Sequence, residues 1–178
     1  TPLDARWGPQ IELAQLADQL AFLTPKHYSD YATRLEQIPL LIDQHIQQMR
    51  FGLNAGRMPP RVAMAGSVEQ CLVLGDANFT GDPASSPMYA PFLDIDQADP
   101  AAVRARQAIA DGITPAFARL AAFLRDDYIP RCRDTIGASA SKDGLPAYEH
   151  SLRVNTTMPF TAQQIHDLGL SEVARIRA

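Results

Sequence analysis

The chain has only two cysteines and one tryptophan among its 178 residues, and it has no surplus of basic side chains. Lys and Arg total 16 against 20 Asp and Glu, which gives a formal net charge of -4. Its arginines are scattered, so no basic stripe is available to follow a phosphate backbone. No window approaches the run of about 20 apolar residues that a membrane helix needs. We therefore expect neither a nucleic-acid partner nor a membrane span.

The two cysteines are far apart in the sequence and do not have the spacing of zinc ligands. Cys71 and Cys132 belong to no paired Cys or His motif, which excludes a zinc knuckle. A disulfide between them stays open, because sequence separation says nothing about the distance between the two side chains. Of these alternatives we favour two buried thiols over a disulfide.

The sequence also lacks the common catalytic motifs. Its four histidines are isolated, whereas a zinc helix needs two on one face with a nearby carboxylate, and no glycine-rich nucleotide loop occurs. Ser139 and Lys142 match the Ser-x-x-Lys pattern of acyl-enzyme hydrolases, but Asp143–Pro146 would break the helix that this chemistry requires, which favours a plain loop. Adjacent Asp126 and Asp127 could form an acid/base pair, although solvated surface carboxylates are the favoured interpretation. We expect no cofactor in this chain and no catalysis by the chain alone.

Apolar residues at helical spacing are the strongest structural signal that the sequence contains. They recur at steps of three and four over residues 28–53, which predicts a helix with one buried face. Thr24 and Pro25 suit its N-cap and first position, while Pro39 removes a backbone donor and predicts a kink. His45 shares the apolar face, so we expect it at the edge of the core and not as a metal ligand.

A second long amphipathic run is predicted over residues 100–128. Asp99 and Pro100 have the residue types of an N-cap and a first helical position. Gly112 and Pro115 interrupt this run, and Pro115 in particular loses a hydrogen bond to the preceding turn. We expect either two helices or one sharply kinked helix that packs against the first.

The C-terminal region combines one extended signal with several helix signals. Residues 148–158 are rich in Val, Thr and Tyr and are the only plausible extended stretch. Thr161 and Gln164 then form a capping box that predicts a helix start. Gly169 is predicted to end this helix, and Ser171 to begin another. The expected fold class is all-α, with kinked amphipathic helices packed as an irregular bundle and at most a small extended stretch near 148–158.

Several short segments carry a resemblance to a known family: Tyr31–Leu35, Ile38–Pro39, Gly52–Pro60, Gly144–Tyr148, Thr156–Thr157 and Ile165–Ile176. Together they resemble the bacterial family catalogued as domain of unknown function 885, over essentially the whole chain. The resemblance implies that full-length members are largely helical and are similar to zinc metallopeptidases of the gluzincin type. It also implies that they are often exported or lipoproteins, which suggests a periplasmic or cell-envelope location.

The resemblance implies a zinc site outside this chain. The zinc-binding helix of the family begins with His-Glu, and further ligands and a general base lie downstream of the position where this sequence stops. No His-Glu helix occurs here. We therefore expect residues 1–178 to be a single helical segment of a larger peptidase-like domain that is truncated at both ends. Zinc is expected in the full-length parent, with a peptide substrate and the remaining part of the polypeptide as partners.

A segment without the metal can supply only the cleft wall and substrate contacts. If residues 148–157 are extended, they could bind a peptide backbone by strand addition, with Tyr148, Arg153 and Thr156 as polar substrate contacts. The alternative is that these side chains merely pack and cap. The functional hypothesis is a helical scaffold and substrate-cleft segment of a zinc-dependent peptidase-like hydrolase that is not catalytic alone. The alternative hypothesis is a non-catalytic helical binding or structural module.

Overall fold

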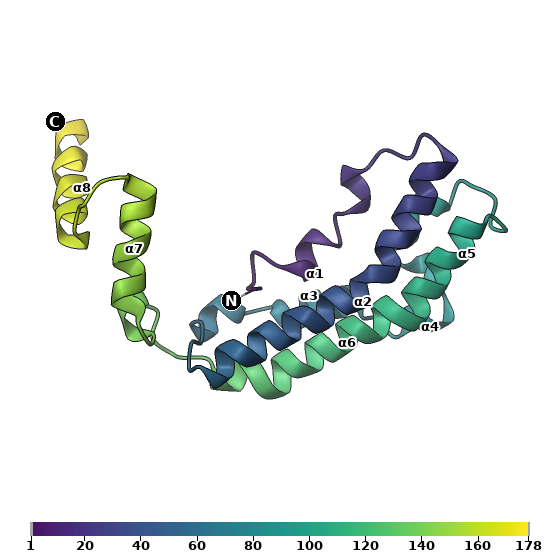
Figure 1. Cartoon of the computed structure of the whole chain (residues 1–178), viewed down its shortest axis with the longest axis horizontal. Coiled ribbons are helices and arrows are strands. Elements are labelled where there is room, and N and C mark those ends of the chain that lie inside the picture. Colours follow the sequence, from purple (N-terminus) through teal and green to yellow (C-terminus); the bar gives the residue numbers. More distant parts are fainter. Residues whose placement is uncertain (1, 178) are drawn as a thin grey trace. The chain divides into compact units, whose positions relative to one another are not determined.

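The computed structural model describes residues 2–177, which are all-α and contain no strand (Figure 1). The predicted fold class is confirmed. The chain divides into two compact units, Thr1–Asp134 and Thr135–Ala178, which are described separately below. That the chain forms one segment of a larger domain stays a prediction.

The first long helix, α2, runs from Pro25 to Asn54 and confirms the helix predicted from the apolar pattern. Its buried face carries the predicted stripe, including Tyr31, Leu35, Ile38, Ile42 and Met49. Pro39 lies inside the helix without ending it, and α2 bends part-way along its length in Figure 1. The backbone N–H of Leu23 donates to Nδ1 of His27 at 3.1 Å. A side chain of the first turn therefore fixes the backbone that precedes the helix.

The second long run is one continuous series of helical turns, and not two separate helices. Its segments are α5 (Pro100–Gln107), the π turn η5 (Ala108–Ile113), α6 (Thr114–Phe123), a second π turn η6 (Leu124–Tyr128) and the 3₁₀ turn η7 (Ile129–Arg131). The predicted cap is confirmed, because Asp99 Oδ1 accepts from the Ala101 N–H at 2.8 Å. Pro115 has no N–H to donate to the carbonyl of Asp111, and the widened π turn before it absorbs this gap.

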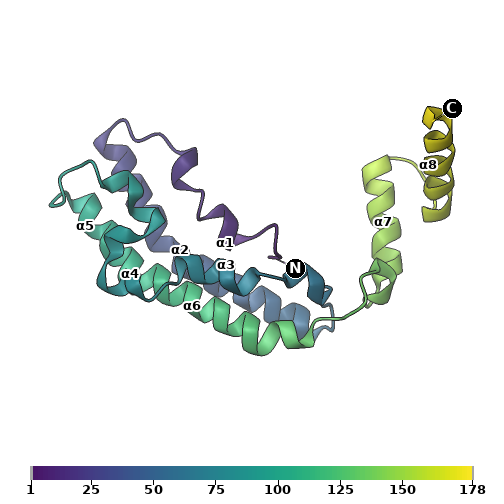
Figure 2. The same cartoon turned by 180° about the vertical axis from the view of Figure 1, so that it is seen from behind.

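The two long runs lie side by side and point in the same direction (Figures 1 and 2). Pairs of close residues rise together along both runs: Glu36 with Arg104, Pro39 with Gly112, Asp43 with Arg119 and Arg50 with Phe123. The connection between them supplies shorter elements that cover the core: η2 (Arg61–Met64), α3 (Ser67–Leu74), α4 (Asn78–Gly81), η3 (Pro83–Ser85) and η4 (Pro87–Phe92). Before α2, the chain forms α1 (Pro9–Glu12) and η1 (Ala17–Gln19). Gly75 is needed where α3 ends, because a Cβ there would lie 2.8 Å from the backbone nitrogen of Ala118.

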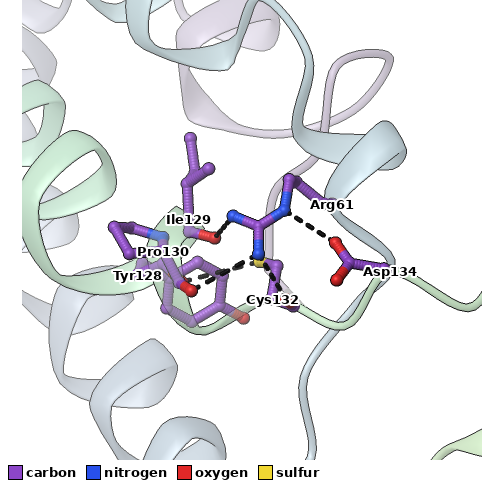
Figure 3. A network of polar contacts seen from close by, with 6 residues as sticks. All are labelled: Arg61, Tyr128, Ile129, Pro130, Cys132 and Asp134. Atoms are coloured by element: carbon purple, nitrogen blue, oxygen red, sulfur yellow. Dashed lines mark hydrogen bonds and ion pairs between the residues drawn. The ribbon is translucent and has the colours of Figure 1, made fainter.

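Arg61 holds the C-terminal end of the second run (Figure 3). Its Nη1 donates to the carbonyl of Ile129 at 2.7 Å and its Nη2 to the carbonyl of Cys132 at 3.1 Å. Nε pairs with Asp134 Oδ1 at 3.0 Å, and Nη2 also reaches the carbonyl of Pro130 at 3.4 Å. The last carbonyls of a helix have no partner within it, so one guanidinium here satisfies several acceptors at once.

The second unit contains η8 (Ala138–Ala140) and the helices α7 (Gly144–Thr156) and α8 (Ala162–Arg177). The prediction of an extended stretch near 148–158 is wrong, because most of these residues lie in α7. Leu145, Tyr148, Leu152 and Thr156 recur at steps of three and four, and this helical period outweighs the β-propensity of Val, Thr and Tyr.

The start of α8 was predicted correctly and its end was not. The Thr161 N–H donates to Gln164 Oε1 at 2.9 Å, and the Gln164 N–H donates to Thr161 Oγ1 at 3.2 Å, which confirms the capping box. The predicted stop at Gly169 is wrong, since the helix continues through it to Arg177. Ser171 caps no new helix, because its hydroxyl donates backward to the carbonyl of Leu168 at 2.8 Å.

Candidate functional site

The three predicted substrate contacts all lie on α7. Tyr148 is 43% exposed, Arg153 is exposed, and Thr156 is half-buried. Strand addition by this segment is ruled out, because the helix already uses the backbone N–H and C=O groups that a peptide strand would need. The Thr156 hydroxyl donates to the carbonyl of Leu152 at 2.7 Å, which favours the capping alternative for this residue. Binding of a substrate by these side chains stays a prediction.

The helices α7 and α8 have almost no core of their own. Within 135–177, Gly144 is the one residue that is fully buried. Large apolar side chains are exposed on both helices: Leu145, Val154, Leu168, Leu170, Val173 and Ile176. On α8, residues 165, 168, 173 and 176 fall on one side of the helix at about 100° per residue. These side chains therefore form an apolar face on α8, and such a face is typical of a surface that another element covers.

The structure brings a different group of residues together, in a hollow between α2 and α6. The hollow has a volume of about 690 Å³, within the usual range of ligand pockets. Its charged lining residues are Asp43 and Arg50 from α2, and Arg119, Asp126 and Asp127 from α6 and the π turn η6. We call it the α2–α6 hollow.

Two of the three carboxylates in the hollow already have cationic partners. Arg119 Nη2 lies 3.0 Å from Asp43 Oδ1, so this pair bridges the two long runs. Arg125 donates to both carboxylate oxygens of Asp126 at 2.8 Å. These hydrogen bonds from Arg125 lower the pKa of Asp126 below its usual value, which keeps this carboxylate ionised.

One cation and one anion in the hollow have no ion-pair partner among residues 2–177. The guanidinium carbon of Arg50 lies 5.0 Å from the centre of the Phe123 ring, a cation–π arrangement that leaves the edge of the guanidinium open. Asp127 is half-buried and forms no ion pair in the described part of the chain. The adjacent carboxylates Asp126 and Asp127 can be recognised in the sequence. That Arg50 lies in the same hollow cannot, because no local sequence signal places α2 beside them.

The described residues do not offer a metal site. No group of three or more His, Cys, Asp or Glu side chains in residues 2–177 is arranged to hold a metal ion. Cys71 and Cys132 are both buried free thiols, as predicted. Burial raises the pKa of Cys71 to about 12 and also raises the pKa of Cys132, so neither is a thiolate nucleophile at neutral pH.

Comparison with known protein families identifies the family to which the chain belongs. The family described as bacterial protein of unknown function (DUF885) matches residues 1–178. The chain belongs to the DUF885 family. Searches of curated proteins and of solved structures gave no match to this DUF885 chain. In the part of the chain that the structure describes, no helix is both long enough and apolar enough to cross a membrane.

Proposed function

We propose that this DUF885 chain is the helical scaffold and substrate-cleft segment of a zinc-dependent peptidase-like hydrolase, and that it does not catalyse alone. The observation that carries this proposal is the α2–α6 hollow, which has the size of a ligand pocket and exposes charges of both signs. A peptide presents complementary groups, since its termini and backbone are polar and charged. The resemblance to gluzincin-type peptidases supplies the reaction class.

The chain's own residues would bind and orient the substrate. Residues 2–177 do not fit a zinc site, so no step at the metal is assigned to them. In peptidases of this type a zinc ion polarises the scissile carbonyl and activates a water molecule. A wall that holds the substrate in a fixed position beside such a centre accelerates the reaction, because the reacting groups no longer have to meet by random encounter. Two long parallel helices provide a rigid wall of this kind.

We also propose that the remaining part of the polypeptide covers the exposed apolar side chains of α7 and α8. A 43-residue stretch, 135–177, with a single fully buried glycine does not bury enough apolar surface to be stable by itself. The isolated chain should therefore bind an apolar fluorescent dye. Leu168→Gln with Ile176→Gln should reduce the dye signal, while Leu93→Gln, at an exposed leucine of the first unit, should leave it unchanged. Equal dye binding by all three proteins would contradict the assignment of this face.

The decisive experiment uses a longer natural protein that contains this chain. About one zinc ion per polypeptide, together with peptide hydrolysis that a chelator abolishes and zinc restores, would support the proposal. A protein that folds, holds no zinc and hydrolyses no peptide would end the enzyme hypothesis. In that case the alternative gains support, namely a non-catalytic helical module whose α2–α6 hollow binds a ligand without changing it.

A further inference from the structure

We propose that the α2–α6 hollow binds a short peptide with two free termini, with Arg50 holding the terminal carboxylate and Asp127 the terminal ammonium group. This inference deepens the proposed function, on which it rests for the choice of a peptide as ligand. It assigns a binding role to two residues outside α7, where the sequence placed the substrate contacts.

Only some of the charged residues that line the hollow have an ion-pair partner. Asp43 is paired with Arg119, and Asp126 is paired with Arg125. What remains in the described structure is one guanidinium, that of Arg50, and one carboxylate, that of Asp127. An anionic ligand alone would leave Asp127 unmatched, and a cationic ligand alone would leave Arg50 unmatched. A ligand with one charge of each sign matches both.

The Phe123 ring limits the orientations that the Arg50 guanidinium can adopt before a ligand binds. Its guanidinium lies over the Phe123 ring at 5.0 Å from the ring centre, so the aromatic face restricts one side of the group. The N–H groups point outward along the edge of the guanidinium plane, which is the geometry that a carboxylate accepts with two parallel hydrogen bonds. A guanidinium that is already oriented loses less conformational entropy when it binds.

A dipeptide is the shortest peptide that carries one free ammonium group and one free carboxylate group. At about 3.3 Å per residue, an extended dipeptide spans about 7 Å between the two. Arg50 and Asp127 line the same hollow, and the Arg50 guanidinium lies over the Phe123 ring, four positions before Asp127 in the second run. The apolar side chains of Ile46 and Phe123 in this hollow suit apolar side chains on that ligand.

Calorimetric titration of the 178-residue chain with the dipeptide Leu-Leu tests the proposal without zinc and without hydrolysis. Leu-Leu should bind, and the same dipeptide with an acetylated N-terminus and an amidated C-terminus should bind at least about tenfold more weakly, because both charged contacts are lost. Arg50→Gln and Asp127→Asn should each weaken binding of Leu-Leu by about tenfold or more. Arg34→Gln, at an exposed arginine of the same helix that does not line the hollow, is the matched control and should bind as the unaltered chain does.

One further variant separates the charge of Arg50 from the geometry of its guanidinium, and circular dichroism separates both from loss of folding. Arg50→Lys keeps the charge and loses the planar fork, so its affinity should fall between those of the unaltered chain and Arg50→Gln. Circular dichroism of every variant establishes that the helices persist. Absence of Leu-Leu binding, equal binding of the capped dipeptide, or unaltered binding by folded Arg50→Gln and Asp127→Asn would each overturn the proposal. Binding of Leu-Leu by a chain whose longer parent holds no zinc would remove the enzyme hypothesis and leave the peptide site standing.

Discussion

Pro39 of α2 and Gly112 of the second run face each other at the point where both helices are irregular. A Cβ atom built on Gly112 would lie 3.0 Å from Cγ of Pro39. Pro39 interrupts the hydrogen bonds of α2, and Gly112 lies in the π turn Ala108–Ile113. The absence of a side chain at Gly112 lets the proline ring approach, so the two irregularities fit one another across the interface.

This contact predicts an energetic coupling between the two residues. Gly112→Val should lower the free energy of unfolding by about 1 to 3 kcal/mol, because its branched side chain must push the Pro39 ring away. Pro39→Ala in the same protein should recover part of that loss. Urea unfolding of the two single variants and the double variant measures the coupling. Additive effects of the two substitutions would contradict the contact.

Features of this fold that depend on residues close together in the sequence could be predicted. Asp99 and the capping box at Thr161 were predicted because an N-cap depends on residues three positions apart at most. Pro39 and Gly112 were also visible as irregularities. That they meet was not predictable, because their contact depends on the parallel pairing of two helical runs that are far apart in the sequence.

The candidate site was less predictable for the same reason. The prediction of an extended stretch near 148–158 is wrong because a helical period of apolar residues overrides the preference of Val and Thr for strands. Asp127 is predicted only as part of a carboxylate pair, and the sequence does not show that Arg50, which lies over Phe123, lines the same hollow. Gly169 was taken as a helix end although an open position inside a helix tolerates glycine at a cost of about 1 kcal/mol.

Arg61 should be important for stability although its side chain is 43% exposed. Arg61→Ala leaves the carbonyls of Ile129 and Cys132 without their guanidinium partner and should lower the free energy of unfolding by about 1 to 3 kcal/mol. Arg61→Lys should not restore it, because an ammonium group cannot reach several acceptors in one plane. Arg125→Ala, at an exposed arginine that pairs only with its neighbour Asp126, is the control and should leave urea unfolding nearly unchanged. Full stability of Arg61→Lys would show that charge alone is sufficient.

His45 should make stability depend on pH. Burial disfavours the charged imidazolium and lowers the pKa of His45 from its usual 6.5, while the carboxylate of Glu12 acts in the opposite direction. A lowered pKa in the folded state means that the contribution to stability is complete above 6.5 and is lost as the pH falls through the folded-state value. The free energy of unfolding should therefore decrease between about pH 7 and pH 5.

The substitution that isolates this effect is His45→Phe, which removes the titrating group and also the buried Nδ1 atom that has no hydrogen-bond partner. The variant should show a smaller decrease in stability over the same pH range. His150→Phe replaces an exposed histidine on α7 and serves as the control. A pH dependence that His45→Phe does not reduce would assign the decrease to other groups.

The helix α8 should respond to local substitutions more strongly than a helix inside a core. None of its described residues is fully buried, so its stability depends on its cap and on intrinsic helix propensity. Thr161→Ala removes the capping box and should destabilise the first turn by about 1 kcal/mol. Gly169→Ala should stabilise the helix by about 1 kcal/mol, because no atom lies within 4 Å of the added Cβ. Amide hydrogen exchange over residues 162–177 reports both changes, and the double variant should resemble the unaltered chain. If neither substitution alters exchange in the isolated chain, α8 is held by packing against another surface, and its exposed apolar side chains are already covered in solution.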